Sequence, residues 1–555
     1  MKVLWDIWLY RDLIAGDTAR YFAGGGASWA NKLELDPVWS PLYGVFLGTL
    51  QKAMDDPYAI AIIHRVLIVV AVSLAVLAVF RALLPPGIAW ALALWWALLP
   101  VNYDTLYEVY LFGLLPAATA ILLAQRLSDR LMWGSVLTVL LLGAVTSRYE
   151  LLIAAVAWCG AWLVAEVRRA SDDREDGLGR RLRRTAVAFV VPLLITGAVA
   201  TFVVVRSNAD RSVAEAFSDR QDATVCQNYA VGYKQLHDDF GGSPSLDCAV
   251  LSKRVFGAER PTPWEALTAN PGAMREYILW NVALIPAGVQ LALFNAISAD
   301  RGNPDVIPVS TGSLWALVGL LAVLSALAAG AILAWRERRR WGSTWLKSRA
   351  FGWLALGCVA SSALPSILLI RPRPCLIFYL TVAMLALIGL AALIIGARWP
   401  RLADLRWTLP MLALAAIALV PSHYGPGYET PQTGLGRPVL AAVRHVEPFQ
   451  EKVSDPSVSL AAPRFASAIC HYLVMDEGCT PVDVPHELAS QPFGTSLPAL
   501  LERKSVDVAY FDESMMRNPG LRASLKQLSR AGWKELASSR AAAAPWMLLS
   551  RPAGQ

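Results

Sequence analysis

Charged residues are scarce in this sequence. Only 17% of its 555 residues are Asp, Glu, Lys or Arg, whereas an average soluble protein has about 25%. Hydrophobic residues make up 55%, and the mean hydropathy is +0.44. Disordered chains are polar and highly charged, so this composition excludes extended disorder and argues against a single soluble domain. The net charge of +7 comes from bases scattered over several short segments, and we therefore expect no nucleic-acid partner.

Cysteine is also scarce, with seven residues in the chain. Cys226 and Cys248 share one long polar loop, and Cys470 and Cys479 share the C-terminal segment. Neither pair has the C-x-x-C spacing of a zinc site, so we expect two disulfides and an oxidising environment for both segments. No other clear ligand cluster appears, so no cofactor is predicted, and a divalent metal ion stays an open alternative.

Long apolar runs, by contrast, are abundant. A helix that crosses a bilayer needs about 20 mostly apolar residues. Eight runs approach or reach this length, and two shorter ones are further candidates; they are 58–80, 109–126, 131–147, 149–167, 185–206, 310–335, 350–370 and 375–397, then 86–101 and 407–421. The sequence predicts about ten membrane spans.

The basic residues between these runs predict an orientation. Segments 168–184, 336–349 and 398–406 are rich in Arg and Lys, and such loops stay on the cytoplasmic side. Alternating the spans then places the remaining connections outside, among them 207–309 and everything after residue 421. Both expected disulfides fall on this outer side, where thiols are oxidised.

Two domains joined by a linker are expected from these patterns. Residues 1–421 form a helical membrane domain with an outer insertion at 207–309, residues 422–434 form a Gly/Pro-rich linker, and residues 435–555 form a small α/β domain outside the membrane. The fold class is therefore a mainly α polytopic membrane protein with a C-terminal extracytoplasmic α/β domain.

Local patterns predict further elements. Within the C-terminal domain we expect strands at 457–462, 506–511 and 546–550 and helices at 465–474, 497–504 and 520–532. Stretch 272–297 has the pattern of a surface-lying helix pair broken at Pro286, and 38–54 has that of a helix on the outer membrane surface. The alternative for 38–54 is that it crosses the membrane.

Polar residues gather where the predicted spans meet their outer loops. Four such groups come from distant parts of the sequence but share one expected membrane depth: Asp17, Tyr21 and Asp36; Asp104 and Glu108; Arg148 and Glu150; and Arg371 and Arg373. A carboxylate at this depth can remove a proton from an acceptor hydroxyl, and arginines can hold a lipid phosphate by forked hydrogen bonds. Together these groups fit a transferase that uses a lipid-phosphate donor.

Simpler roles exist for each group. Arg148 and Glu150 would pair within a tight turn, and Arg371 and Arg373 would anchor the chain at the interface. Asp104 and Glu108 would keep a loop soluble or cap a helix, and Asp17 would cap the helix that runs through Tyr21.

The order of these motifs resembles the GT-C class of polytopic glycosyltransferases. The resemblance is to the bacterial relatives of protein O-mannosyltransferases and of the lipid A aminoarabinose transferase, and it covers about residues 1–400. The matching motifs are Asp17 with Tyr21, Asp36 before Pro41-Leu42-Tyr43, Asp56-Pro57-Tyr58 before His64-Arg65, Arg148 with Glu150, Arg371-Pro372-Arg373 before Phe378-Tyr379, and the terminal Trp546-Met547-Leu548-Leu549. The chain departs from the family at Thr18, where the best-known members have a second acidic residue, and it shows no span before the acidic loop.

This resemblance implies an inverting transfer of a sugar from a polyprenyl-phosphate donor to a hydroxyl of a cell-envelope glycan, lipid or protein. Asp17 would be the base, and Arg148, Arg371 and Arg373 would hold the donor phosphate. Asp36, Asp104, Glu108 and Glu150 would serve the acceptor side, and Tyr21 and Tyr43 would line the cavity. The implied location is the bacterial inner membrane, with the active site on its periplasmic face.

Two other classes of function remain open at this point. A transporter or flippase for a lipid-linked sugar would carry polar residues deep within its spans, and the spans here have few. A non-catalytic subunit of an envelope assembly would need none of the outer carboxylates and arginines to share a cavity.

Overall fold

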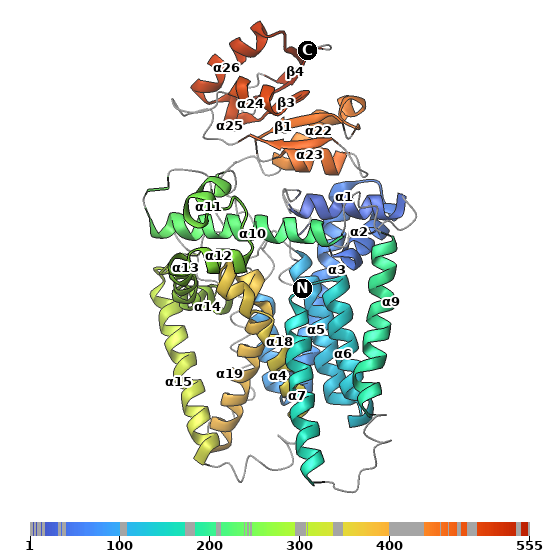
Figure 1. Cartoon of the computed structure of the whole chain (residues 1–555), viewed down its shortest axis with the longest axis vertical. Helices are drawn as coiled ribbons and strands as arrows, with labels where there is room; N and C mark the ends of the chain where they lie inside the picture. Colours follow the sequence, from blue (N-terminus) through green and yellow to red (C-terminus); the bar gives the residue numbers. More distant parts are fainter. Residues whose placement is uncertain are drawn as a thin grey trace. The chain divides into compact units, whose positions relative to one another are not determined.

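The computed structural model describes most of the predicted helices and the C-terminal sheet (Figure 1). The described residues are 4, 7, 13, 17–30, 35, 40–99, 108–172, 184–206, 213–237, 239–240, 244, 247–294, 307, 309–336, 348–398, 438–455, 457–463, 465–473, 479–484, 497–539 and 545–552. The expected span 407–421 and the linker 422–434 lie outside them.

Two compact units make up the chain. The first consists of Met1–Asp6, Val66–Val205 and Ala209–Pro431, and the second of Ile7–Arg65, Arg206–Asn208 and Gln432–Gln555. The second unit thus joins the N-terminal outer elements to the C-terminal domain, a grouping that differs from the predicted boundary at residue 421.

Apolar helices form most of the first unit. They are α3 (Pro57–Leu83, in this unit from Val66), α4 (Pro86–Leu98), α5 (Glu108–Arg126), α6 (Asp129–Thr146), α7 (Leu151–Asp172), η4 (Ala186–Val190) with α9 (Val191–Val205), α15 (Leu314–Arg336), α18 (Ala350–Ser361), η5 (Ser366–Ile370), η6 (Pro374–Ile377) and α19 (Phe378–Arg398). Among the described residues, eight helices are long and apolar enough to cross a membrane, and α4 and α6 are shorter apolar helices. The chain therefore has the architecture of a multi-pass membrane protein.

These helices alternate in direction, so their basic residues collect at one end of the unit, here called the basic end (Figure 1). Helices α3, α5, α7, α15 and α19 each carry a basic residue in their last turn. Contacts at this end confirm the alternation, because Gln125 of α5 donates to the Ser348 carbonyl oxygen before α18, at 2.9 Å. Arg184, just before η4, lies 3.9 Å from Glu166 of α7. The described residues in or next to segments 168–184 and 336–349 thus lie at the basic end.

Shorter helices occupy the opposite end of this unit. They are α10 (Val213–Leu236), α11 (Cys248–Phe256), α12 (Pro263–Ala269), α13 (Pro271–Ala283) and α14 (Ile285–Phe294). Helix α10 runs across the direction of α15 and α19 (Figure 1). The segment 271–294 is long and apolar enough to be counted among the eight candidate spans. Its helix is interrupted at Leu284, two residues before the expected break at Pro286.

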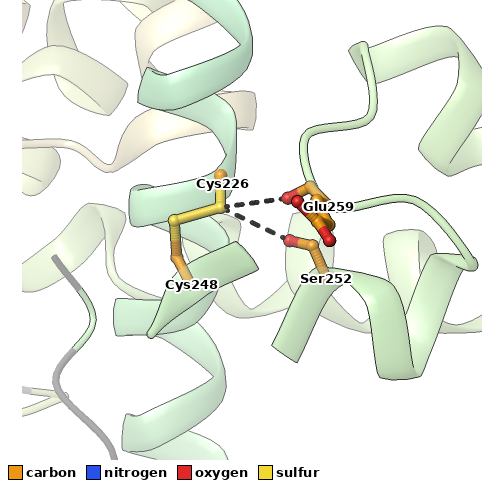
Figure 2. The surroundings of a disulfide bond; sticks show 4 residues. All are labelled: Cys226, Cys248, Ser252 and Glu259. Atoms are coloured by element: carbon orange, nitrogen blue, oxygen red, sulfur yellow. Dashed lines mark hydrogen bonds between the residues drawn. A yellow bond between two sulfur atoms is a disulfide. The ribbon is translucent and has the colours of Figure 1, made fainter. Parts of the chain in front are cut away.

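A disulfide between Cys226 and Cys248 joins α10 to α11 (Figure 2). The hydroxyl of the buried Ser252 donates to the Cys226 sulfur at 3.6 Å, and the Glu259 carbonyl oxygen lies 3.6 Å from the same sulfur. Around the bridge, Tyr229, Phe256 and Tyr277 form part of a separate apolar core. The insertion predicted at 207–309 therefore has a core of its own, closed by the first expected disulfide.

The C-terminal part of the second unit is a five-stranded sheet with helices on both faces. The strands are β1 (Ser459–Ala462), β2 (Thr480–Asp483), β3 (Val508–Phe511), β4 (Lys534–Ser539) and β5 (Trp546–Ser550), in the order β2-β1-β3-β5-β4. Strand β1 is parallel to β2 and β3, and β5 is antiparallel to β3 and β4.

Successive residues of each strand face opposite sides of the sheet, so the core has two layers. Leu460 of β1 and Tyr510 of β3 pack toward α22 (Pro438–Val446) and α23 (Ala466–Leu473). Ala461 and Phe511 pack toward α24 (Leu497–Arg503) and α26 (Pro519–Arg530). This is the period of two expected for strands that are covered on both faces.

Three strands and three helices of this domain confirm the sequence predictions. They are β1, β3, β5, α23, α24 and α26. Strands β2 and β4 were not predicted, because Pro481 interrupts one and the other, Lys534–Ser539, is too polar to show an alternating pattern. The second expected disulfide, Cys470–Cys479, links α23 to the residue before β2.

The N-terminal helices α1 (Asp17–Ala30) and α2 (Pro41–Ala53) form a closely packed pair. A Cβ atom on Gly25 would lie 2.9 Å from the Gly48 nitrogen and 3.0 Å from the Gly44 carbonyl oxygen. Glycines four residues apart on α2 therefore let the two backbones approach, as small residues do between membrane helices. At 13 residues, α2 is about 20 Å long, too short to span the hydrocarbon core alone.

Helix α1 is also covered by the C-terminal domain within this unit. Ala19 and Phe22 of α1 share an apolar cluster with Ala468 and Tyr472 of α23. The rings of Phe22 and Tyr472 are 4.6 Å apart. Residues separated by more than 400 positions thus form one core, which explains why the contacts group residues 7–65 with the C-terminal domain.

The glycine contact gives a direct test of this helix pair. We expect Gly25→Ala to lower the melting temperature of the purified protein, because the added methyl group meets backbone atoms that cannot move aside, at a cost of about 1–3 kcal/mol. Gly24→Ala is the matched control, since a Cβ atom there meets nothing within 4 Å. It should leave the melting temperature unchanged or raise it. Equal melting temperatures for the two variants would contradict the close α1–α2 contact.

Candidate functional site

Arg148 and Glu150 lie in the turn between α6 and α7, at the end of the first unit opposite the basic end. Both side chains are buried, at 5% and 6% exposure. The guanidinium makes a forked contact with the carboxylate: Arg148 Nε donates to Glu150 Oε2 at 3.1 Å, and Arg148 Nη2 donates to Glu150 Oε1. The guanidinium carbon also lies 3.8 Å from the centre of the Tyr110 ring. The pairing considered from the sequence is therefore present, and it is buried.

Gly113 provides the space for this arginine. A Cβ atom on Gly113 would lie 2.5 Å from Arg148 Cγ and 2.9 Å from the Tyr379 hydroxyl. That hydroxyl donates to the Gly113 carbonyl oxygen at 3.3 Å. Tyr110, Gly113 and Tyr379 thus complete what we call the Arg148 cluster, with Arg148 and Glu150. None of the three was a predicted site residue. The one signal for them in the sequence was a glycine within an apolar helix.

Arg371 is buried at the turn that joins η5 to η6. It is only 2% exposed, and its Nη2 donates to the Asn228 side-chain oxygen of α10 at 2.7 Å. Its Nε donates to the Ile370 carbonyl oxygen at 3.1 Å. Arg371 therefore fastens the outer helix α10 to the late turn, and Asn228 is a partner that the sequence gave no reason to select.

The neighbouring residues hold the same turn against the outer helices. A Cβ atom on Gly288 of α14 would lie 2.3 Å from the Pro372 carbonyl oxygen, so the two backbones are in close contact. Tyr277 of α13 donates to the Leu369 carbonyl oxygen at 2.8 Å. Arg373 follows as a half-buried side chain. The helix η6, which comes next, contacts α5, the helix that carries Tyr110 and Gly113.

Three aromatic residues connect the first three helices in the second unit. Tyr21 of α1 packs edge-on against Tyr43 of α2, with ring centres 5.2 Å apart. The Tyr43 hydroxyl and His64 Nε2 of α3 are hydrogen-bonded at 2.9 Å. Tyr43 is 1% exposed and His64 is 3% exposed. Both predicted aromatic residues are thus buried together, with a histidine that the sequence placed two turns into a span.

The four remaining acidic predictions have no described side chain. Asp17 is the first residue of α1, and Glu108 is the first residue of α5. Asp36 and Asp104 lie outside the described residues. Asp17 stands one helical turn before Tyr21, and a negative charge in the first turn of a helix is favoured by the helix dipole.

No group of three or more His, Cys, Asp or Glu residues that could hold a metal ion occurs in the part of the chain that the structure describes. An unusual polar group is His471 of α23, beside the disulfide cysteine Cys470. Its Nδ1 atom is buried without a hydrogen-bond partner. Burial, and the positive charge of Arg20 on α1, lower the pKa of this histidine from 6.5 to about 4.

No protein-family model matches the chain, and no curated protein matches it.

The Arg148 cluster predicts the effect of a single methyl group. Gly113→Ala should displace Arg148 and lower the melting temperature, since overpacking costs about 1–3 kcal/mol and also disturbs a buried ion pair. Gly160→Ala in α7 is the control, because a Cβ atom there meets nothing within 4 Å. The measurement is thermal unfolding in detergent. A Gly113→Ala protein as stable as Gly160→Ala would refute the packing described here.

The buried histidine predicts a pH dependence of stability. Because the folded pKa of His471 lies below its unfolded value of 6.5, the unfolded chain binds an extra proton as the pH falls below about 6.5. Stability should therefore decline from about pH 6.5 to about pH 4, by roughly 3 kcal/mol at most. Burial also lowers the pKa of His445, which acts in the same direction.

Melting temperatures measured between pH 7.5 and 4.5 test this expectation. His471→Phe keeps an aromatic ring but cannot bind a proton, so its melting temperature should fall less over this range than that of the unaltered protein. The same slope in both proteins would show that His471 is not the titrating group.

Proposed function

We propose that this protein is an integral-membrane glycosyltransferase. It moves a sugar from a polyprenyl-phosphate donor to a hydroxyl of a cell-envelope glycan, lipid or protein, with inversion at the anomeric carbon. Asp17 acts as the base, and the reaction takes place on the periplasmic face of a bacterial inner membrane.

The observation that carries this proposal is the distribution of charge along the apolar helices. In the described spans, every Asp, Glu, Lys and Arg except Arg65 lies within about two turns of a helix end, and His64 is the one histidine deeper than that. The basic residues mark one end, and the Arg148 cluster and Arg371 mark the other. Ion-coupled transporters instead carry ionisable groups near the middle of the bilayer. This pattern favours an enzyme that meets a lipid substrate at one membrane surface.

The chemistry of the residues supports the same conclusion. In the proposed reaction, the Asp17 carboxylate removes the proton of the acceptor hydroxyl, whose oxygen attacks the anomeric carbon as the bond to the lipid phosphate breaks. The leaving phosphate carries the negative charge that develops, and Arg148, Arg371 and Arg373 stabilise it. Arg148 already holds one carboxylate in a forked contact, a geometry that also suits a phosphate. No metal is needed for this scheme.

The remaining site residues have supporting roles in the proposal. Glu150 orients Arg148, and Asp36, Asp104 and Glu108 serve the acceptor side. The two disulfides lie in segments assigned to the oxidising side, in agreement with a periplasmic location.

A transfer assay with the purified protein in liposomes tests the proposal. Each of a panel of radiolabelled polyprenyl-phosphate sugars is supplied with envelope acceptors, and the anomeric configuration of the product is determined by NMR. We expect Asp17→Asn to lower kcat at least about a hundredfold, because loss of a general base removes that much catalysis. Asp55→Asn, the same change at an exposed carboxylate before α3, should keep normal turnover.

Three results would contradict this assignment. They are normal turnover by Asp17→Asn, retention of the anomeric configuration, and movement of the labelled lipid between leaflets without transfer of its sugar. The last result would indicate a flippase.

A further inference from the structure

We propose that His64 is a positioning residue of the transfer site: through its hydrogen bond to Tyr43 it holds the Tyr43–Tyr21 ring pair and, through that pair, the first turn of α1 that carries Asp17. This inference rests on the proposed function, because it concerns the placement of the proposed base. It adds a residue and a route of contacts to which no role was assigned above.

His64 occupies a costly position for an imidazole. It is the eighth residue of the 27-residue apolar helix α3, about 10 Å from the helix start. Ionisable side chains at such positions are expensive and usually functional, and their partners are part of that function. His64 is hydrogen-bonded to the Tyr43 hydroxyl at 2.9 Å, and both residues are almost completely buried.

The His64 ring packs against α2. The His64 ring lies 5.5 Å from the Tyr43 ring and 5.6 Å from the Phe46 ring, so α2 surrounds it on one side. A phenylalanine pair would fill the same space without a polar group, so apolar packing alone does not account for these two residues. The hydrogen bond adds a fixed position for the Tyr43 hydroxyl and therefore a fixed direction for the long axis of the ring.

The Tyr43 ring also contributes to the placement of α1. Tyr21 meets this ring edge-on at 83°, a geometry that is lost if the long axis of either ring changes direction. Farther along α1, the helix is already fixed by Gly25 against α2 and by Gln51, which donates to the Phe22 carbonyl oxygen at 2.7 Å. Tyr21 is thus a contact with α2 close to the first turn, and Asp17 precedes it by one turn.

The experiment is a double-mutant cycle in the transfer assay, with His64→Phe, Tyr43→Phe and the double variant. Tyr43→Phe keeps the ring and removes only the hydroxyl. If the hydrogen bond positions the base, each single variant lowers kcat about tenfold, the donor KM stays within twofold, and the double variant is no worse than either single one. His64→Gln restores activity, because its amide can still bond to the Tyr43 hydroxyl.

Melting temperatures distinguish a positioning role of His64 from an effect on protein stability alone. Phe46→Leu is the matched control: it removes a ring contact to His64 but no hydrogen bond, and it should keep kcat near normal even where it lowers the melting temperature. If His64→Phe does not fold, Tyr43→Phe and His64→Gln decide the question.

The outcomes are distinguishable from failure of the proposed function. Transfer by the unaltered protein, together with normal kcat in Tyr43→Phe, would overturn the role of His64 and leave the glycosyltransferase proposal intact. Losses that add in the double variant would do the same. No transfer by the unaltered protein with any donor would overturn the proposed function and this inference with it.

Discussion

The constraint on which the structure depends is that lipid hydrocarbon cannot form hydrogen bonds. Each polar group of a span must therefore find a partner inside the protein or lie near a helix end. Most charged residues of the described spans lie near a helix end, which leaves long apolar helices between two polar ends. The Arg148–Glu150 pair and the Tyr43–His64 pair instead find their partners inside the protein, because both pairs are buried and hydrogen-bonded.

Close backbone approaches make these buried pairs possible. Gly113 leaves space for the Arg148 side chain, and Gly25 allows α1 to lie directly on Gly44 and Gly48 of α2. In each case the absence of a side chain at one position determines where a polar group or a helix can be placed. Arg148 is held more rigidly than a lysine would be, because two nitrogens of its planar guanidinium group bind the Glu150 carboxylate.

Specific contacts fasten the elements that lie outside the long apolar helices. Arg371 ties α10 to the η5–η6 turn through Asn228, only two residues from the disulfide cysteine Cys226. In the second unit, Phe22 and Tyr472 join α1 to α23, which a second disulfide connects to the sheet. Both disulfides thus lie next to a contact between segments that are far apart in the sequence, and each restricts an element that makes such a contact.

The sequence by itself determined the apolar helices, their alternation and most of the C-terminal strands and helices, because hydrophobic period and run length are local properties. It also selected Arg148, Glu150 and Tyr21, since polar residues at span ends are visible in one dimension, and the family resemblance added Tyr43. Only the tertiary structure decided that α1 belongs with the C-terminal domain, that Asn228 meets Arg371, and that Gly113 faces Arg148. These contacts join residues between 35 and more than 400 positions apart, and no local pattern records which distant side chain will complete a buried polar group.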